Sequence, residues 1–233
     1  MAAGFTEWTL LPHEPIEKLT ENLWRVEGTM PGGNKRVMTL ARLADGRLVM
    51  HNAIALEDEL MAEVDAFGEL AAILVPNAFH RQDAFIMKAR YPNAKVYAPS
   101  GSRAGVAKAV AVDGTYDDVP SDSTVKCRHL DGFPKEGVLS VTSADGVSHI
   151  FCDAVLHTPE KAKFPFSFLL APLGRPAVPR ATRWLFTKDN TVLGADLRKL
   201  AGVDGLKRVI VGHGPTTDTD AAAALGVAAG DCD

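Results

Sequence analysis

The sequence predicts an α/β fold built as a four-layer αββα sandwich. First, short apolar segments typical of strands alternate with helical segments, and such an alternation indicates sheets whose outer faces are covered by helices. Second, each half of the chain contains a hairpin signal, Asp45-Gly46 and Asp145-Gly146 between apolar runs. Third, a chain of 233 residues with 46% apolar residues can build one sizeable core. We therefore predict a single domain over residues 1–233, with a loose leader at 1–20 and an irregular excursion at 159–180.

The first half is predicted to form one sheet and its covering helices. Apolar residues at positions 56, 60, 61, 64 and 67 have the spacing of an amphipathic helix, which Gly68 ends. The apolar run that follows is typical of a strand buried on both faces. We expect the strands of this half, counting the hairpin as one unit, at 21–28, 36–52, 70–75 and 95–98, and its helices at 56–67, 83–90 and 103–110.

The second half is predicted to form the other sheet. Three successive strands come first, and the proline-rich and aromatic-rich excursion interrupts the pattern before a last buried strand. An alanine-rich segment at the end of the chain favours a terminal helix. We expect these strands at 124–130, 137–142, 147–155 and 206–211, and the helix at 219–230.

Composition and charge exclude several classes of protein. The net charge of −4 and the lack of a basic block predict no nucleic-acid partner. The three cysteines form no C-x-x-C pair, which fits a reducing compartment and argues against a sulfur-rich metal site. The first residues lack the basic and apolar regions of a signal peptide, and prolines break the apolar stretch near residue 170. We therefore predict a cytoplasmic chain without a transmembrane segment.

Polar residues follow the ends of four predicted strands. The most specific signal is Gly212-His213-Gly214-Pro215, in which glycines on both sides of a histidine permit a tight turn directly after a buried strand. Asp153 ends another apolar strand, where a carboxylate is costly unless it is paired or ligated. Residues 77–83 and His51 occupy two further strand ends, where layered α/β proteins gather their ligand-binding residues.

Each of these signals also has a structural explanation. His213 fits a surface turn, and Asp153 fits a turn cap. Asn77 and His80 suit the capping of the helix that follows them. A lone histidine such as His51 is commonly an internal residue whose hydrogen bonds are satisfied.

Taken in order, these strand ends resemble the metallo-β-lactamase superfamily. The hairpin at 36–52 is similar to the opening strands of that superfamily, and the strand at 71–75 lies where its main motif strand lies. The segment 150–153 resembles the strand that delivers a bridging aspartate. The segment 211–215 resembles the one that delivers the last metal ligand. The resemblance covers the chain from about residue 21 to residue 215 and implies the αββα fold.

The signature of the superfamily, His-x-His-x-Asp-His, is missing from its expected place. When its first histidine is placed at Asn77, the second falls on Phe79, the aspartate on Arg81 and the last histidine on Gln82. An arginine thus stands where an acid should be, and no ligand of this motif is kept in register.

The other expected ligand positions are only partly kept. Phe133 takes the place of the middle histidine, and His51 takes the place of the aspartate that ends the first hairpin. Asp153 and His213 are the two residues that match the superfamily pattern. Two ligands cannot hold the two ions of a binuclear hydrolase.

The favoured prediction is therefore a protein of this fold that lacks the motif, binds no metal, and is non-catalytic or binds an unidentified ligand. The alternative is a hydrolase of an ester, thioester or phosphoester with a rebuilt mononuclear zinc site made of His51, Asp153 and His213. His80 could add a third imidazole to this site, but it is out of register, and a place on the helix would point its side chain elsewhere. Whether the chain is an enzyme stays open at this point.

Seven residues are candidates to line the cleft: His51, Asn77, His80, Arg81, Asp83, Asp153 and His213. Arg81 in that cleft would repel a cation and would suit a small anionic molecule. In the superfamily, insertions like the excursion at 159–180 commonly cover the cleft as a lid, and the resemblance implies the same role here. The aromatic excursion at 159–180 and its neighbouring arginines also suit a partner surface, which leaves a homodimer as a third alternative.

Overall fold

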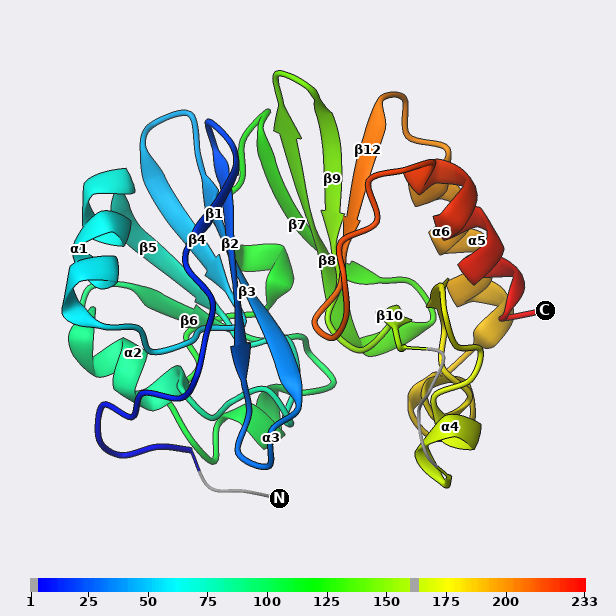
Figure 1. The fold of residues 1–233 in the computed structure, drawn as a ribbon, viewed down its shortest axis with the longest axis horizontal. Coiled ribbons are helices and arrows are strands. Elements are labelled where there is room, and N and C mark those ends of the chain that lie inside the picture. The colour runs from blue at the N-terminus through cyan, green and yellow to red at the C-terminus, as the bar shows by residue number, and fades with distance from the viewer. Residues whose placement is uncertain (1–3, 160–163) are drawn as a thin grey trace.

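The computed structural model describes residues 4–159 and 164–233. Two sheets pack face to face, and helices lie on the outer face of each (Figure 1). Helices α1 (Asp58–Phe67) and α2 (Ala84–Arg90) cover one sheet, and α5 (Asn190–Ala201) and α6 (Ala221–Gly230) cover the other. This is the predicted α/β sandwich of four layers. Among the described residues, no helix combines the length and apolar character needed to cross a membrane.

Within the described residues, the first sheet has six strands in chain order. They are β1 (Glu17–Thr20), β2 (Leu23–Thr29), β3 (Lys35–Arg42), β4 (Arg47–His51), β5 (Glu69–Leu74) and β6 (Lys95–Tyr97). Strands β3 and β4 form the predicted hairpin, and Gly46 has the positive φ of +88° that its turn requires. Strands β4, β5 and β6 run parallel, so their carboxyl ends meet at one edge of the sheet.

The leader prediction needs a correction at its C-terminal end. Residues 17–20 form β1, which pairs with β2, and His13 makes a further bridge to Gly28. Alternation of apolar and polar residues is weak in this short edge strand, so the sequence pattern did not reveal it. Residues 1–3 of the predicted leader and 160–163 of the predicted excursion lie outside the described residues.

The second sheet contains four strands in the part of the chain that the structure describes. They are β7 (Val125–Leu130), β8 (Phe133–Ser143), β9 (Gly146–Ile150) and β12 (Leu206–Ile210), arranged in the order β12-β9-β8-β7. Strand β12 runs parallel to β9, so the loops that follow these two strands leave the sheet side by side. The Asp145-Gly146 turn joins β8 to β9 as predicted.

The core between the sheets follows from strand alternation. Val49 and Leu74 from the first sheet and Leu139, Ile150 and Ile210 from the second belong to one buried cluster. Alternate residues of the same strands pack outward under the helices. This double burial explains why several strands are apolar throughout.

Several short elements lie between the main strands and helices, two of them between β6 and β7 and the others in or beside the excursion. They are α3 (Arg103–Val106), the 3₁₀ turn η1 (Tyr116–Asp118), β10 (Leu156–His157), α4 (Phe166–Leu169), β11 (Pro176–Ala177) and the π-helix η2 (Thr182–Phe186). Strands β10 and β11 pair with each other outside the two main sheets. The described part of the excursion therefore has little regular structure, and η2 follows it directly.

Candidate metal centre

Three polar side chains from separate loops meet at one end of the sandwich. His80 lies in the loop after β5, Asp153 follows β9, and His213 follows β12. The two sheets are also joined there, because the Val37 amide of β3 donates a hydrogen bond of 3.0 Å to the Gly212 carbonyl oxygen. The loop ends of parallel strands thus supply all three residues.

The donor atoms of these three residues have the spacing of ligands around one ion. The two Nε2 atoms of His80 and His213 are 3.0 Å apart. The Asp153 carboxylate lies 3.3 Å from the Nε2 atom of His80 and 3.4 Å from that of His213. Ligands held about 2.1 Å from one metal ion lie about 3.0–3.4 Å from each other in octahedral or tetrahedral geometry. The residues present therefore fit a single metal ion.

Hydrogen bonds on the far sides of both imidazole rings determine their tautomers. His213 Nδ1 faces the backbone carbonyl oxygen of Lys35, which can only accept. His80 Nδ1 lies 3.0 Å from Asn52 Oδ1, and the Asn52 amide is oriented by its own donation to the Val37 carbonyl oxygen. Both Nδ1 atoms therefore carry the hydrogen, and both Nε2 lone pairs face Asp153. Such an arrangement needs a cation or a proton between the rings.

Three neighbours hold Asp153 in place. Asn77 donates a hydrogen bond of 2.7 Å to its carboxylate, and the Thr182 hydroxyl donates to its backbone carbonyl oxygen. Its own amide donates to the buried carboxyl group of Glu136, at 2.9 Å. These contacts fix both the backbone and the side chain of Asp153, which suits a metal ligand.

The electrostatics of the group favour positive charge. Burial acts to raise the pKa of Asp153, but the charges and hydrogen bonds of His80 and His213 outweigh it and hold that pKa well below its ordinary value. Burial acts to lower the pKa of His213, yet the hydrogen bond and charge of Asp153 raise it overall. Side-chain exposures of 28% for Asp153 and 27% for His213 leave one side of the group open to solvent.

His51 lies outside this group of three. It ends β4 and is buried, and burial followed by the nearby charge of His80 lowers the pKa of its imidazole to about 3. Neither ring nitrogen has a hydrogen-bond partner among the described residues. The structure brings His80, and not His51, together with Asp153 and His213. His80 precedes α2, and its ring turns toward the cluster, contrary to the expectation that it would point elsewhere.

Of the remaining candidates, Asn77 belongs to the site, whereas Arg81 and Asp83 contact other parts of the fold. Asn77 reaches Asp153, as described above. A guanidinium nitrogen of Arg81 donates to the carbonyl oxygen of Gly105 in α3. Asp83 forms a buried ion pair with Arg36, whose guanidinium is 2.6 Å from the Asp83 carboxylate. Arg81 and Asp83 therefore stabilise the loop on which His80 lies.

Sequence reasoning missed Asn52, Glu136 and Thr182. Asn52 has a φ of +58°, a left-handed conformation that asparagine tolerates well. Glu136 is a fully buried carboxyl group within β8, directly before the segment 137–142 that the sequence predicts as a strand. Burial, followed by the charge of Asp153, raises the pKa of Glu136.

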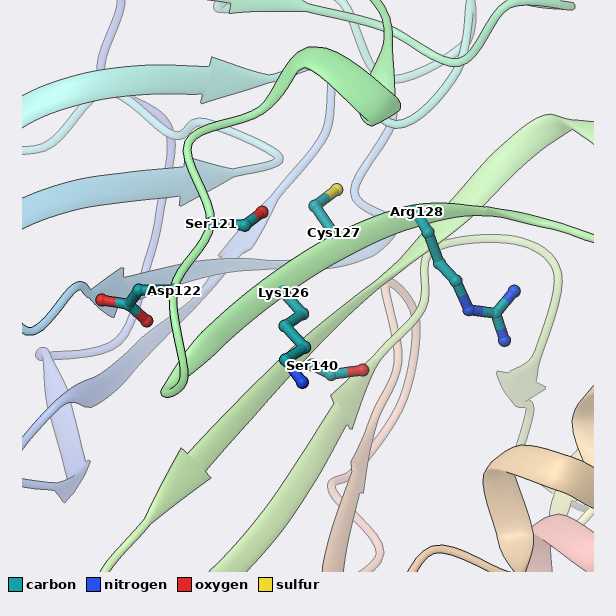
Figure 2. Close-up of a pocket in the computed structure, with 6 residues that line it drawn as sticks. All are labelled: Ser121, Asp122, Lys126, Cys127, Arg128 and Ser140. Atoms are coloured by element: carbon teal, nitrogen blue, oxygen red, sulfur yellow. The ribbon is translucent and has the colours of Figure 1, made fainter.

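A separate hollow lies along β7, away from the residues of the cluster. Its volume is about 400 Å³, and Figure 2 shows the side chains that line it: Ser121, Asp122, Lys126, Cys127, Arg128 and Ser140. Its charged groups are largely engaged in structural contacts. Arg128 forms a bidentate ion pair with Asp196. The Asp122 carboxylate accepts hydrogen bonds from the amides of Ala44 and Thr124. This hollow therefore supports the edge of the sheet and offers no cluster of catalytic groups.

Comparison with solved structures identifies the fold. The chain is similar to the metallo-β-lactamase DIM-1 exposed to ceftazidime, with a TM-score of 0.63 at 14% identity over 97% of this chain and 100% of that one. The metallo-β-lactamase TMB-1 gives a TM-score of 0.61 at 14% identity over 95% and 98%. FIM-1 from Pseudomonas aeruginosa in its mono-zinc form gives 0.59 at 10% identity over 93% and 96%. The chain has the metallo-β-lactamase fold, as the sequence resemblance predicts.

Comparisons by sequence add no closer relative. No family model matches the chain, and no curated protein matches it significantly. At identities of 10–14%, the structural likeness establishes the fold and leaves the chemistry of the site to its own residues.

Proposed function

We propose that His80, Asp153 and His213 hold one divalent metal ion, with zinc as the first candidate, and that the chain is a mononuclear hydrolase of an ester, thioester or phosphoester. One observation carries the proposal: two imidazole Nε2 lone pairs and a carboxylate face one another 3.0–3.4 Å apart. Two histidines and one carboxylate are a common donor set for a catalytic metal that keeps open positions. The geometry thus favours the second of the two functions predicted from the sequence, with His80 in place of His51.

Different residues of the chain would bind the ion, orient its ligands and admit the substrate. His80 and His213 supply Nε2 donors whose rings are oriented by Asn52 and the Lys35 carbonyl oxygen. Asn77 orients the Asp153 carboxylate. The exposed sides of Asp153 and His213 give a substrate access. A divalent ion at this position would supply Lewis acidity toward a carbonyl or phosphoryl oxygen.

A structural neighbour supports the stoichiometry. FIM-1, whose fold is similar, has been solved in a mono-zinc form, so a single zinc ion is compatible with that protein. For the present chain, Phe79, Arg81 and Gln82 replace ligand types at the positions of the superfamily motif, which argues against a second ion.

Metal analysis of the purified protein tests the first half of the proposal. We expect about one equivalent of zinc after incubation with zinc and gel filtration, and less than a tenth of an equivalent in His213→Ala and Asp153→Asn. His129→Ala is the matched control, because His129 lies near the protein surface beside Asp117 and outside the group of three. Circular dichroism should show that all variants are folded.

Hydrolysis assays test the second half. With zinc or manganese added, we expect the wild type to cleave at least one ester, thioester or phosphodiester, and both Asp153→Ala and His213→Ala to lose that activity. A wild-type protein with less than a tenth of an equivalent of metal would overturn the proposal and favour the non-catalytic, ligand-binding prediction. Activity that survives both substitutions would also contradict it.

A further inference from the structure

Large aromatic and aliphatic side chains are exposed next to the three-residue group. Phe79 is 50% exposed and lies directly before His80 in the chain. Trp184 and Leu185 in η2 are 59% and 64% exposed. Residues of this size are usually buried, and a local concentration of them on a surface commonly marks a binding groove.

The two segments that carry these side chains meet and are both tied to Asp153. The rings of Phe79 and Phe186 form an edge-to-face pair with centroids 6.0 Å apart. The Phe79 amide donates to Asn77, which in turn donates to the Asp153 carboxylate. On the other side, Thr182 at the start of η2 donates to the Asp153 backbone. The two segments that carry the aromatic pair are therefore both anchored through hydrogen bonds to Asp153, a residue of the proposed metal site.

A lysine lies against this aromatic pair. Lys135 Nζ is 5.0 Å from the centroid of the Phe186 ring. Its neighbour Glu136 accepts the Cys152 and Asp153 amides, so the backbone of this segment is anchored at the same site. Lys135 has no ion-pair partner among the described residues. Its charge is thus available to an anionic ligand that also contacts the rings.

We propose that Phe79, Phe186 and Lys135 form the substrate subsite of this centre, and that it selects aryl anions, in which an aromatic ring carries a carboxylate or a similar negative group. The inference rests on the proposed hydrolase function and names its substrate class. Stacking on the exposed ring of Phe79 and the accessible part of the half-buried Phe186 ring removes apolar surface of both partners from water, and Lys135 neutralises the charge at the edge of the ligand ring. A small polar substrate gains neither contact.

Equilibrium binding of 2-naphthoate, measured by calorimetry with zinc-loaded and with chelator-treated protein, tests this subsite without using activity. We expect Phe79→Ala to weaken binding about tenfold through loss of the aromatic contact. Lys135→Gln should weaken it about three- to fivefold, as for a solvent-exposed ion pair. The neutral analogue 2-naphthylmethanol should bind Lys135→Gln and wild type alike. Acetate, which carries the charge without the ring, should show no dependence on Phe79.

Two matched controls separate this subsite from general surface effects. Phe85→Ala removes an aromatic residue of similar exposure, 44%, from α2, and Lys126→Gln removes a lysine from β7. Both should bind 2-naphthoate like the wild type. Equal losses in Phe79→Ala and Phe85→Ala would overturn the subsite.

The zinc content of each variant separates failure of the subsite from failure of the hydrolase proposal. Phe79→Ala and Lys135→Gln should keep one equivalent of zinc. If the wild type holds no zinc but its naphthoate binding still depends on Phe79 and Lys135, the hydrolase proposal fails and the aryl-anion site stands. If sedimentation shows a dimer that Trp184→Ser and Phe79→Ala dissociate, the exposed rings are an interface between copies of the chain and the subsite is wrong.

Discussion

Arg36 and Asp83 form an ion pair in which each side chain is only 1% exposed. Arg36 also donates to the backbone carbonyl oxygens of Thr29 and Ala53, and the Asp83 carboxylate accepts the Ala55 amide. The pair thus ties β2 and the segment after β4 to the start of α2. Burial raises the pKa of Asp83, although Arg36 opposes that shift.

Removing one partner of this ion pair should destabilise the fold strongly. We expect Asp83→Ala to lower the free energy of unfolding by about 3–5 kcal/mol, because the Arg36 charge is left buried without compensation. Urea titration followed by circular dichroism measures the change. Asp58→Ala, which breaks the exposed Asp58–Arg90 pair, is the control and should cost about 1 kcal/mol or less. A similar cost for the two substitutions would contradict this role for Asp83.

At the scale of single residues, the sequence predicts well which residues lie near the site. It predicts less well the direction in which their side chains point. Asp153 and His213 follow buried strands, so their placement at one edge is a consequence of the topology. In the loop between β5 and α2, by contrast, His80 turns inward while Arg81 turns to α3. Spacing alone carries no information about these directions, because an irregular loop has no fixed period. Glu136 was missed since an isolated glutamate within a strand has no sequence signature of burial.

A buried histidine links the second sheet to helix α5 through hydrogen bonds. His149 of β9 lies between the Ser140 hydroxyl of β8 and the Leu200 carbonyl oxygen of α5, at 2.9 Å and 3.2 Å. Its Nε2 donates to Leu200 and its Nδ1 accepts from Ser140, which requires the neutral ring. Burial lowers the pKa of His149 to about 4, despite an opposing contribution from its hydrogen bond to Leu200.

This depressed pKa predicts a loss of stability in mild acid. The unfolded chain takes up the proton near pH 6.5, whereas the folded chain resists it until about pH 4. The neutral ring therefore contributes stability above pH 6.5, and about 3 kcal/mol of it is lost as the pH falls to 4. We expect urea unfolding to show this loss in the wild type but not in His149→Asn. A difference between the two proteins that is constant from pH 7 to pH 4 would contradict it.

At the scale of elements, strong periodicity or a defined turn residue made prediction possible. The Asp45-Gly46 and Asp145-Gly146 hairpins lie where expected, and α1 matches its apolar spacing. Strand β1 had no such signal, and the sequence indicates a short element at 182–187 without its π-helical form. Strand β1 is held by pairing with β2, and η2 by contacts of its side chains with distant loops. Non-local interactions of this kind do not appear in a local sequence pattern.

At the scale of the molecule, the three proposed ligands come from both halves of the sandwich. His80 belongs to the first half, and Asp153 and His213 belong to the second. An ion bound to all three would link the two sheets across their shared end, in addition to the hydrogen bond between Val37 and Gly212. Binding to the folded state alone raises the free energy of unfolding.

Zinc should therefore raise the melting temperature of the whole domain. At a free zinc concentration about 100 times the dissociation constant, the gain is about 2.7 kcal/mol, equivalent to about 5–10 °C for a domain of this size. Differential scanning calorimetry with and without zinc measures the shift. Asp153→Asn should lose it, and Asp131→Asn, in the exposed turn between β7 and β8, should keep it. An equal shift in both variants would indicate zinc binding elsewhere.

The three side chains of the proposed centre all lie just beyond strand ends, and no core strand residue belongs to the group. Substitutions at these positions change donor chemistry without altering the apolar contacts that hold the sheets together. The scaffold and the reactive group can therefore diverge at different rates during evolution. An architecture of this kind can therefore carry different sets of donor residues at its strand ends while it continues to fold.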